Sequence, residues 1–290
     1  MIALCSVMML VEIVGGTLFG SLALVADGVH MASHAGAILI AALAYRFARR
    51  HASDRRFTFG TGKVGDLAGF SSAIVLAMIA IFVGYEAVVR LFQPVMIHFS
   101  EAIPIAVLGL GVNIASAWLL SSPEHAHSHA HGHDHEHDQR GPSSATHRDH
   151  NFRSAFVHVV GDAAVSVLAI LGLLSARFLG WVFMDPVMGL VGATVIAAWA
   201  YSLVRDTTRV LVDMTPDTVL EDQIRRHIEA AGDVVMDLHL WRLGPGHLGA
   251  IVSVSTAHGR DCDFYRSQLK QFNSLSHVTV EVFLRSRASD

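Results

Sequence analysis

Long apolar stretches alternate with short polar links over the first two thirds of the chain, and this pattern predicts an α-helical membrane protein. A helix needs roughly 20 mainly apolar residues to cross the hydrocarbon core of a bilayer. Only a short link around Gly20-Ser21 separates the first two stretches, so we expect a tight antiparallel hairpin there. The pattern predicts six transmembrane helices, at approximately 2–20, 22–46, 64–91, 102–120, 153–176 and 182–204.

Basic residues predict how these helices are oriented. The links after the second and fourth stretches and the segment after the sixth are rich in arginine, whereas residues 92–101 contain neither Lys nor Arg. Because Lys and Arg are enriched on the cytoplasmic side, both termini are expected in the cytoplasm, with the chain in a cell (inner) membrane. The first stretch has no basic region before it and no obvious cleavage site, so we expect a retained helix rather than a signal peptide.

Residues 121–151 form a polar, histidine-rich insertion without apolar periodicity, which predicts a cytoplasmic loop within a transmembrane domain spanning residues 1–205. Nine of the 19 histidines lie in this loop. Such a tract binds divalent metals loosely, and metal capture is favoured over the alternative of a solvated linker. The candidate capture residues are His125, His127, His129, His131, His133, His135 and His137.

Residues 206–290 have the pattern of a small soluble domain. Thr218-x-x-Glu221 resembles a capping box at the start of an amphipathic helix, and Gly244-Pro245-Gly246 suits a turn between two alternating strands. The order helix–strand–strand–helix–strand favours a ferredoxin-like α+β cytoplasmic domain. The expected elements cover residues 218–231, 234–243, 248–256, 263–272 and 278–284.

Composition agrees with a membrane protein and excludes other classes. The chain is 52% hydrophobic and 16% charged, whereas soluble domains carry about 25% charged residues. A formal net charge of −4 gives no reason to expect nucleic acid as a partner. Cys5 and Cys262 lie far apart in different contexts, so neither a disulfide nor a thiolate metal site is expected.

Two pairs of metal-ligand residues lie inside apolar stretches: His30 with His34, and His158 with Asp162. A spacing of four residues places both members of a pair on one helix face. Together the pairs supply three imidazoles and one carboxylate, a tetrahedral set for a divalent transition metal. The alternative is that each histidine bonds a neighbouring helix, but two matched pairs favour a transport site. Asp27 is a candidate either to accept an N–H from a ligating imidazole or to lie at the outer mouth.

Other polar residues in the apolar stretches have expected structural roles. Glu12, Glu86 and Asn113 are expected to join helices rather than bind metal. Asp185-Pro186 resembles the structural entrance to the sixth helix, whose small residues fit close packing. Four histidines of the soluble domain are either a second metal site or ordinary surface residues: His239, His247, His258 and His277.

The chain resembles the cation diffusion facilitator family over essentially its whole length. The segments that carry the resemblance are SLALVADGVHMASHA, RRFTFGTGKVGDLAGF, HVVGDAAVSVLA, MDPVMG and DLHLWRLGPG. The resemblance implies a homodimer in the lipid bilayer that exports divalent metal ions from the cytoplasm in exchange for protons, without a cofactor. It makes the two ligand pairs the transport site.

Two features distinguish the chain from zinc members of that family. Such members usually carry aspartate at the position of His34, and the imidazole here suits Co(II) or Ni(II) at least as well as Zn(II). The ADGVHMASHA segment is similar to the cobalt/nickel efflux (DmeF-like) branch, with Zn(II) or Fe(II) as the alternative cargo. A family loop site falls on Asp54, Phe57 and Thr61, of which only the acid could bind metal, so that site is expected to be absent.

The resemblance also implies a structural salt bridge between Lys63 and Asp213 at the hinge between domains, and a cytoplasmic ligand at His239. Two other classes of function remain as alternatives. An intramembrane metalloenzyme would need an open metal position and an acid–base group, and the HExxH motif is absent. A membrane metal sensor would bind metal through the loop and the soluble domain without moving it.

Overall fold

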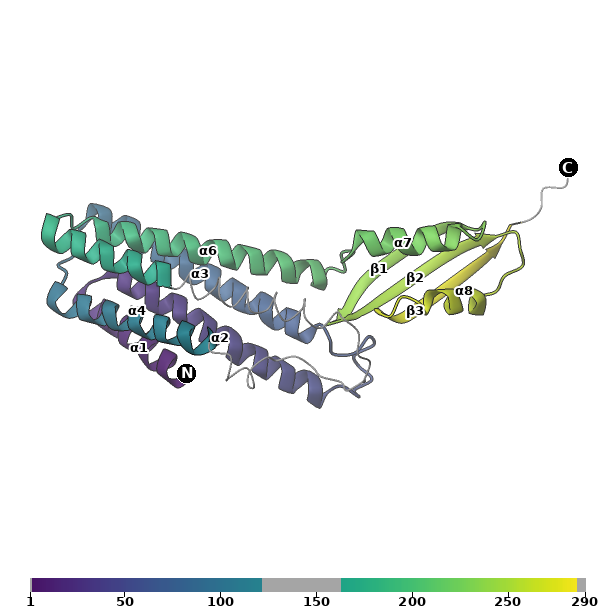
Figure 1. Cartoon of the computed structure of the whole chain (residues 1–290), viewed down its shortest axis with the longest axis horizontal. Helices are drawn as coiled ribbons and strands as arrows, with labels where there is room; N and C mark the ends of the chain where they lie inside the picture. Colours follow the sequence, from purple (N-terminus) through teal and green to yellow (C-terminus); the bar gives the residue numbers. More distant parts are fainter. Residues whose placement is uncertain (1, 122–162, 286–290) are drawn as a thin grey trace. The chain divides into compact units, whose positions relative to one another are not determined.

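The computed structural model describes residues 2–121 and 163–285, which separate into two units (Figure 1). One unit is built from residues 1–37 and 75–199, and the other from residues 38–74 and 200–290. The predicted loop 121–151 and the start of the predicted fifth transmembrane helix lie outside the described residues.

Helices occupy each place where the sequence predicts a transmembrane helix, but only three meet the length and hydropathy that a membrane span requires within the described chain. These three are α2 (Leu22–Arg50), α3 (Val64–Phe92) and α6 (Met184–Leu211). The remaining apolar helices are shorter, 10–17 residues long, so six spans stay a prediction. They lie in α1 (Ile2–Phe19), in α4 (Phe99–Ser121) and at Ala163–Leu179.

A tight turn joins α1 to α2, as the short link predicts. Gly20 has φ +79°, a left-handed conformation that favours glycine, and α2 begins two residues later. The turn is held by Asp185 at the start of α6, which accepts hydrogen bonds from the Ser21 hydroxyl at 2.6 Å and from the Leu22 amide at 2.8 Å. Asp185 therefore satisfies free N–H groups of a helix that is distant in the sequence.

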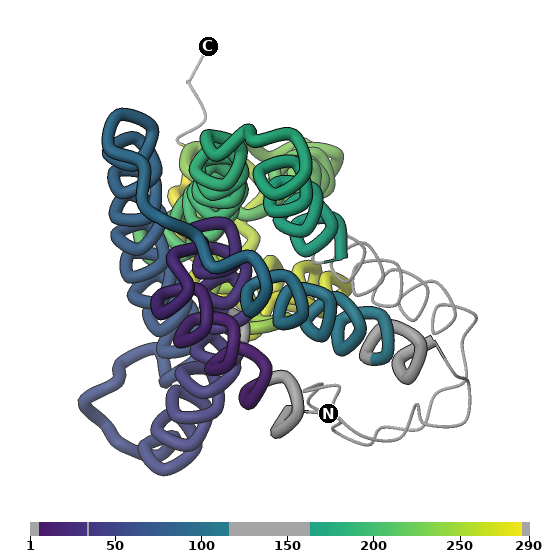
Figure 2. The backbone as a smooth tube through the Cα atoms, turned by 90° about the vertical axis from the view of Figure 1, so that its left-hand side faces the viewer, coloured from purple at the N-terminus to yellow at the C-terminus, as the bar shows by residue number. Residues whose placement is uncertain are grey.

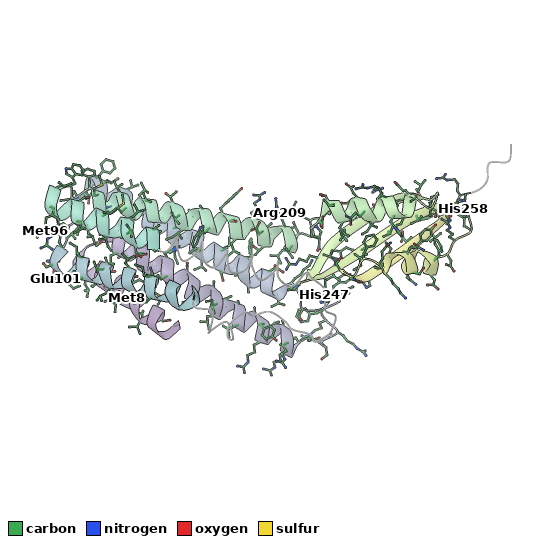
Figure 3. All side chains as sticks on the ribbon, in the orientation of Figure 1. Met8, Met96, Glu101, Arg209, His247 and His258 are labelled. Atoms are coloured by element: carbon green, nitrogen blue, oxygen red, sulfur yellow. The ribbon has the colours of Figure 1, made fainter. Side chains whose placement is uncertain are left out.

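Small residues let α6 approach α2 closely. A Cβ atom on Gly189 would lie 3.0 Å from the Leu22 side chain, and one on Gly192 would lie 3.2 Å from the Cβ of Ala26. On another side of the same unit, α1 packs along α4 (Figure 2), where Met8, which is labelled in Figure 3, lies near Gly109. The close α2–α6 packing agrees with the prediction made from the small residues of the sixth stretch.

The soluble domain is a small α/β domain with the predicted order of elements. Its three strands form one sheet in the order β1-β2-β3, with β1 antiparallel and β3 parallel to β2. Buried side chains from both helices and all three strands form one core, in which Tyr265 and Val252 are almost inaccessible. The elements are α7 (Thr218–Glu229), β1 (Val234–Gly244), β2 (His247–Thr256), α8 (Cys262–Leu269) and β3 (Leu275–Leu284).

One local prediction in this domain is confirmed and one is wrong. Pro245 and Gly246 form the turn between β1 and β2, and Gly246 has φ +73°. The capping-box prediction at Thr218 is wrong, because the N-cap is Asp217, whose carboxylate accepts hydrogen bonds from the amides of Val219 and Leu220. Both residues are good N-caps, and the chain enters the helix one residue earlier than the pattern indicates.

Candidate metal centre

His30 lies on α2 and is buried, with 1% of its surface exposed. Its ring centroid is 4.7 Å from that of Trp199 on α6, and the two rings are tilted by 47°. Small residues in α6 let that helix pack closely against α2, so the Trp199 indole lies beside the His30 imidazole. A buried imidazole of this kind can serve as a metal ligand or as a polar contact within the bundle.

One turn before His30, the carboxylate of Asp27 is also buried, with 1% exposure. Its Oδ2 accepts a hydrogen bond from the Ser166 hydroxyl at 2.7 Å, and the Ser166 oxygen accepts one from the Asn113 side-chain amide at 3.0 Å. These three residues come from α2, from the helix at Ala163–Leu179 and from α4. Asn113 thus joins helices as the sequence predicts, whereas no pattern indicated Ser166.

The rest of the predicted ligand set is not described. His34 lies on α2, four residues after His30, and its side chain is outside the description. His158, Asp162 and the histidines of the predicted capture loop also lie outside the described residues. Among the side chains that the structure does describe, no group of three His, Cys, Asp or Glu residues could hold a metal ion. The assignment of the four residues to one site therefore stays a prediction.

Two acidic residues in apolar helices differ from the expectation that they join helices. Glu86 pairs with Arg90 on its own helix α3, and Arg90 in turn donates to the Gly20 carbonyl at 2.8 Å. Glu12 is fully buried next to Gly28 of α2 and Gly109 of α4, and neither of its carboxylate oxygens has a hydrogen-bond partner among the described residues. Sequence spacing could not show that Glu86 has a partner one turn away in preference to a partner on another helix.

The link between α2 and α3 has no metal-ligand arrangement among its described side chains. Asp54 makes a two-point ion pair with Arg56, whose Nε lies 3.1 Å from Oδ1 and whose Nη2 lies 2.7 Å from Oδ2. The hydrogen bond from Arg56 lowers the pKa of Asp54. Thr61 donates to the Ala48 carbonyl at 3.0 Å, and the Phe57 ring lies near Phe47. The only acid available for a loop site is thus engaged by an arginine.

Lys63 and Asp213 form an ion pair in the unit that contains the soluble domain. Asp213 follows α6 and has φ +57°, which is unusual for a residue with a side chain. Met214, the next residue, donates its amide to the Arg209 carbonyl at 2.9 Å, as in a Schellman motif that ends a helix. Nearby, Phe59 packs edge-on against Trp241 of β1, with ring centroids 5.8 Å apart. The link before α3 is therefore attached to the sheet beside the turn that joins β1 to β2.

The four candidate histidines of the soluble domain have different partners. His239 pairs with Asp237 at 2.9 Å, His247 bonds Ser276 at 2.6 Å, and the His277 ring lies against Phe59. His247 and His258 lie at opposite ends of the sheet (Figure 3). These positions favour ordinary surface roles over one shared metal site in this chain.

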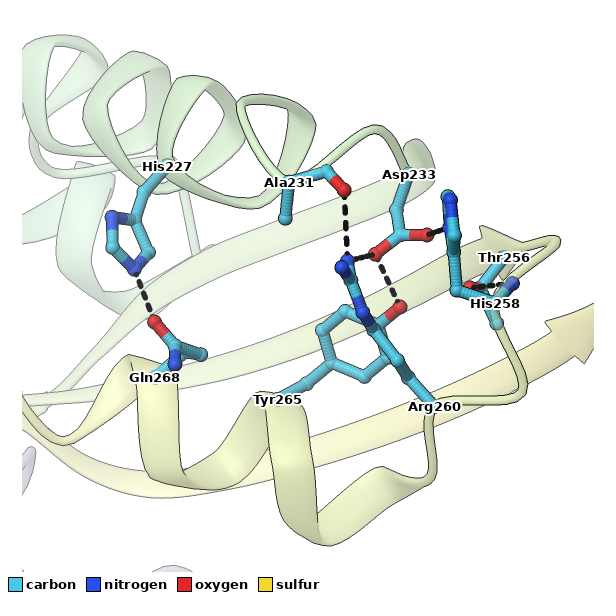
Figure 4. A network of polar contacts seen from close by, with 8 residues as sticks. All are labelled: His227, Ala231, Asp233, Thr256, His258, Arg260, Tyr265 and Gln268. Atoms are coloured by element: carbon cyan, nitrogen blue, oxygen red, sulfur yellow. Dashed lines mark hydrogen bonds and ion pairs between the residues drawn. The ribbon is translucent and has the colours of Figure 1, made fainter.

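A buried network at the far end of the sheet surrounds Asp233 (Figure 4). The Tyr265 hydroxyl and the Arg260 guanidinium donate to Asp233 Oδ2 at 2.6 and 2.5 Å, and His258 lies 3.4 Å from the other oxygen. Burial by itself raises the pKa of Asp233, but hydrogen bonds from these residues and Thr256 outweigh it and lower the pKa to about 2. Burial and the bond to Asp233 raise the pKa of Tyr265. The network joins the ends of α7, β2 and α8, so its role is to hold the domain together.

Comparison with known proteins identifies the kind of protein to which these elements belong. Residues 1–212 match the cation efflux transmembrane domain. The chain is 32% identical over 280 residues to the zinc transporter ZitB of Escherichia coli, covering 94% of this chain and 82% of the relative. It is 31% identical over 288 residues to the metal cation efflux system protein CzcD of Cupriavidus metallidurans, covering 97% and 84%.

A third relative is the cadmium, cobalt and zinc/H(+)-K(+) antiporter of Bacillus subtilis, 30% identical over 240 residues, which are 82% of this chain and 70% of the relative. The domain match and the long alignments agree with the apolar helices and the small α/β domain. The chain therefore belongs to the cation efflux family, and is a membrane transporter of divalent metal cations rather than an enzyme.

Proposed function

We propose that this transporter exports Co(II) and Ni(II) from the cytoplasm in exchange for protons, through a transport site formed by His30, His34, His158 and Asp162. The observation that carries the proposal is the burial of His30. One turn away, the Asp27–Ser166 hydrogen bond links α2 to the helix at Ala163–Leu179, which follows the second ligand pair in the sequence. A titratable side chain buried at membrane depth generally marks an ion path.

The direction of the two helices supports this grouping. Leu24, three residues before Asp27, shares a buried cluster with Leu173, seven residues after Ser166. The two helices therefore run in opposite directions past the Asp27–Ser166 bond. His30 and His34 follow Asp27 by three and seven residues, and Asp162 and His158 precede Ser166 by four and eight. For antiparallel helices, these sequence spacings lead us to expect both pairs on the same side of the bond, at similar heights.

Proton coupling follows from the chemistry of this ligand set. An imidazole binds a metal only when it has lost its proton, so metal and protons compete for the three histidines. Release of metal to the outside allows protons to occupy the ligands, and metal binding from the cytoplasm expels them. Ligands divided between two helices can separate when the bundle rearranges, which provides alternating access.

The cobalt and nickel assignment rests on His34, which replaces a carboxylate by a nitrogen ligand and removes a negative charge. Zinc accepts the same ligands, and the name of the Escherichia coli relative gives zinc while that of the Bacillus subtilis relative gives cadmium, cobalt and zinc. Zn(II) or Fe(II) is therefore the alternative cargo. The transporter is proposed to act as a homodimer in the inner membrane, with both termini in the cytoplasm and the Lys63–Asp213 pair at the hinge.

The test is metal-driven proton movement in vesicles that contain the purified full-length protein. Co(II), Ni(II), Zn(II) and Fe(II) are supplied in turn, and a pH-sensitive dye reports protons. We expect saturable proton movement with Co(II) and Ni(II), and a shift of preference towards Zn(II) in His34→Asp. A native preference for Zn(II) would refute the cobalt and nickel assignment. Metal binding without any proton movement would refute antiport and favour the sensor.

The ligand assignment has its own test. Asp162→Ala should abolish flux while the protein stays in the membrane as a dimer, because the site loses its only carboxylate. Asp206→Ala is the matched control, since this aspartate is exposed on α6 outside the proposed site. Retained flux in Asp162→Ala would remove that residue from the site.

A further inference from the structure

The Asn113–Ser166–Asp27 hydrogen bonds connect three helices beside His30, and none of these residues belongs to the proposed ligand set. We propose that Ser166 and Asn113 are positioning residues that fix Asp27, and that through Asp27 they set the affinity of the transport site for its metal. This inference rests on the proposed function and adds residues that determine how tightly the same site binds.

Burial makes these hydrogen bonds consequential. Ser166 has 0% exposure, Asp27 1% and Asn113 5%, so water cannot readily replace a lost partner. A bond to a carboxylate is also stronger than one between neutral groups, and shielding from water strengthens it further. The bonds therefore hold the three helices at a defined separation.

The donors and acceptors along the chain of bonds define its direction. The Asn113 amide donates to the Ser166 oxygen, which leaves the single Ser166 proton for Asp27 Oδ2. Asn113 thus orients the hydroxyl, and the hydroxyl orients the carboxylate. Ser166 has both roles, so its removal should have a larger effect than removal of Asn113.

The position of Asp27 relative to the site gives the bonds their functional meaning. Asp27 lies three residues before His30, a spacing that places both on one face of α2. Ser166 lies four residues after Asp162, which belongs to the second pair of proposed ligands. The Asp27–Ser166 bond therefore joins α2 to the helix at Ala163–Leu179, one helical turn from His30. Residues that support metal ligands in this way typically change metal affinity by 10–100-fold when they are replaced.

The experiment measures initial rates of Zn(II) and Co(II) flux in vesicles containing the full-length protein, over a range of metal concentrations. Ser166→Ala should raise KM about 10-fold with a smaller change in maximal rate. Ser166→Thr keeps the hydroxyl and should restore KM to within about 3-fold of the native value. Ser71→Ala is the matched control, because the Ser71 hydroxyl donates to the Leu67 carbonyl of its own exposed helix face.

A double-mutant cycle tests whether the effect passes through Asp27. On an Asp27→Asn background, Ser166→Ala should change KM much less than it does in the native protein. An unchanged KM in Ser166→Ala, or equal effects in both backgrounds, would overturn the proposal. If Ser166→Ala fails to reach the membrane, Asn113→Ala carries the test, with an expected rise in KM of about 3-fold and an unchanged KM as the contrary result.

The same measurements separate this inference from the proposed function. His30→Ala should abolish saturable flux if the transport site is assigned correctly, whatever the behaviour of Ser166→Ala. Persisting flux in His30→Ala refutes the proposed site. Loss of flux in His30→Ala together with a native KM in Ser166→Ala leaves the site intact and refutes the positioning role.

Discussion

Replacing Asp233 by asparagine should weaken the soluble domain by about 2 kcal/mol at neutral pH. The pKa of this carboxyl is about 2 in the folded domain against 3.8 for an unperturbed aspartate. Such a difference means that folding favours the ionised over the neutral acid by about 2 kcal/mol. Asparagine has nearly the same shape as the neutral acid, so Asp233→Asn should lose this amount.

The structure indicates where the loss arises. Tyr265 can still donate to an amide oxygen, but the Arg260 guanidinium, at 2.5 Å from the native carboxylate, loses its charged partner. Asp233 is 3% exposed, so solvent screens the interaction little. An exposed ion pair in the same domain provides the contrast, since the side chain of Asp263 is 84% exposed and lies 3.2 Å from Arg266.

The assay is amide hydrogen exchange followed by mass spectrometry on the full-length protein in detergent at a single neutral pH. A loss of about 2 kcal/mol corresponds to exchange about 30-fold faster at the central amides of β2, such as that of Val252. Asp263→Asn is the matched control and should leave these rates nearly unchanged. Acceleration below about 3-fold in Asp233→Asn would refute the conclusion that the charged network stabilises the fold.

Three further predictions concern other parts of the chain. Because the folded-state pKa of Asp233 lies below the ordinary value, the stabilisation that its carboxylate gives is complete above about pH 4 and is lost as the pH falls through about 2. Acid unfolding of the soluble domain, monitored by Trp241 fluorescence, should therefore shift to higher pH in Asp233→Asn. At the end of α6, Asp213→Gly relieves the φ of +57° whereas Asp213→Ala does not, so thermal unfolding should show the alanine variant less stable by about 1 kcal/mol, and equal stability would contradict the strain. Deleting residues 124–138 should reduce metal bound at equilibrium but leave vesicle flux measurable, and complete loss of flux would show that the loop is obligatory.

Local sequence patterns determined the elements of this protein well. Apolar stretches gave helices at the expected places, since the length and hydropathy of a stretch are local properties. Alternating residues and the Pro245-Gly246 turn gave the two antiparallel strands, because a strand needs one buried face and a turn needs particular backbone angles. The cation efflux family was likewise predicted from segments quoted directly from the chain, and the domain match confirms it.

Some local choices were decided by competition between neighbouring residues. Asp217 and Thr218 are both good N-caps, and propensity alone does not select between them. Glu86 has Arg90 one turn away, and it forms an ion pair with this residue rather than with one on another helix. Such alternatives differ by small free energies, so the surrounding packing decides them.

The hydrogen-bond partners of the buried polar groups are known only from the tertiary structure. Asp185 caps a helix 163 residues away, Ser166 reaches Asp27 across 139 positions, and Tyr265 reaches Asp233 across 32. The sequence showed that these polar residues needed partners, because an unpaired polar group is costly to bury. It could not show which partners they have, because that depends on which helix faces meet and at what height. The sequence alone thus determined the helices, the strands and His30 as a candidate ligand, and the packing of the helices placed the Asp27–Ser166–Asn113 bonds beside it.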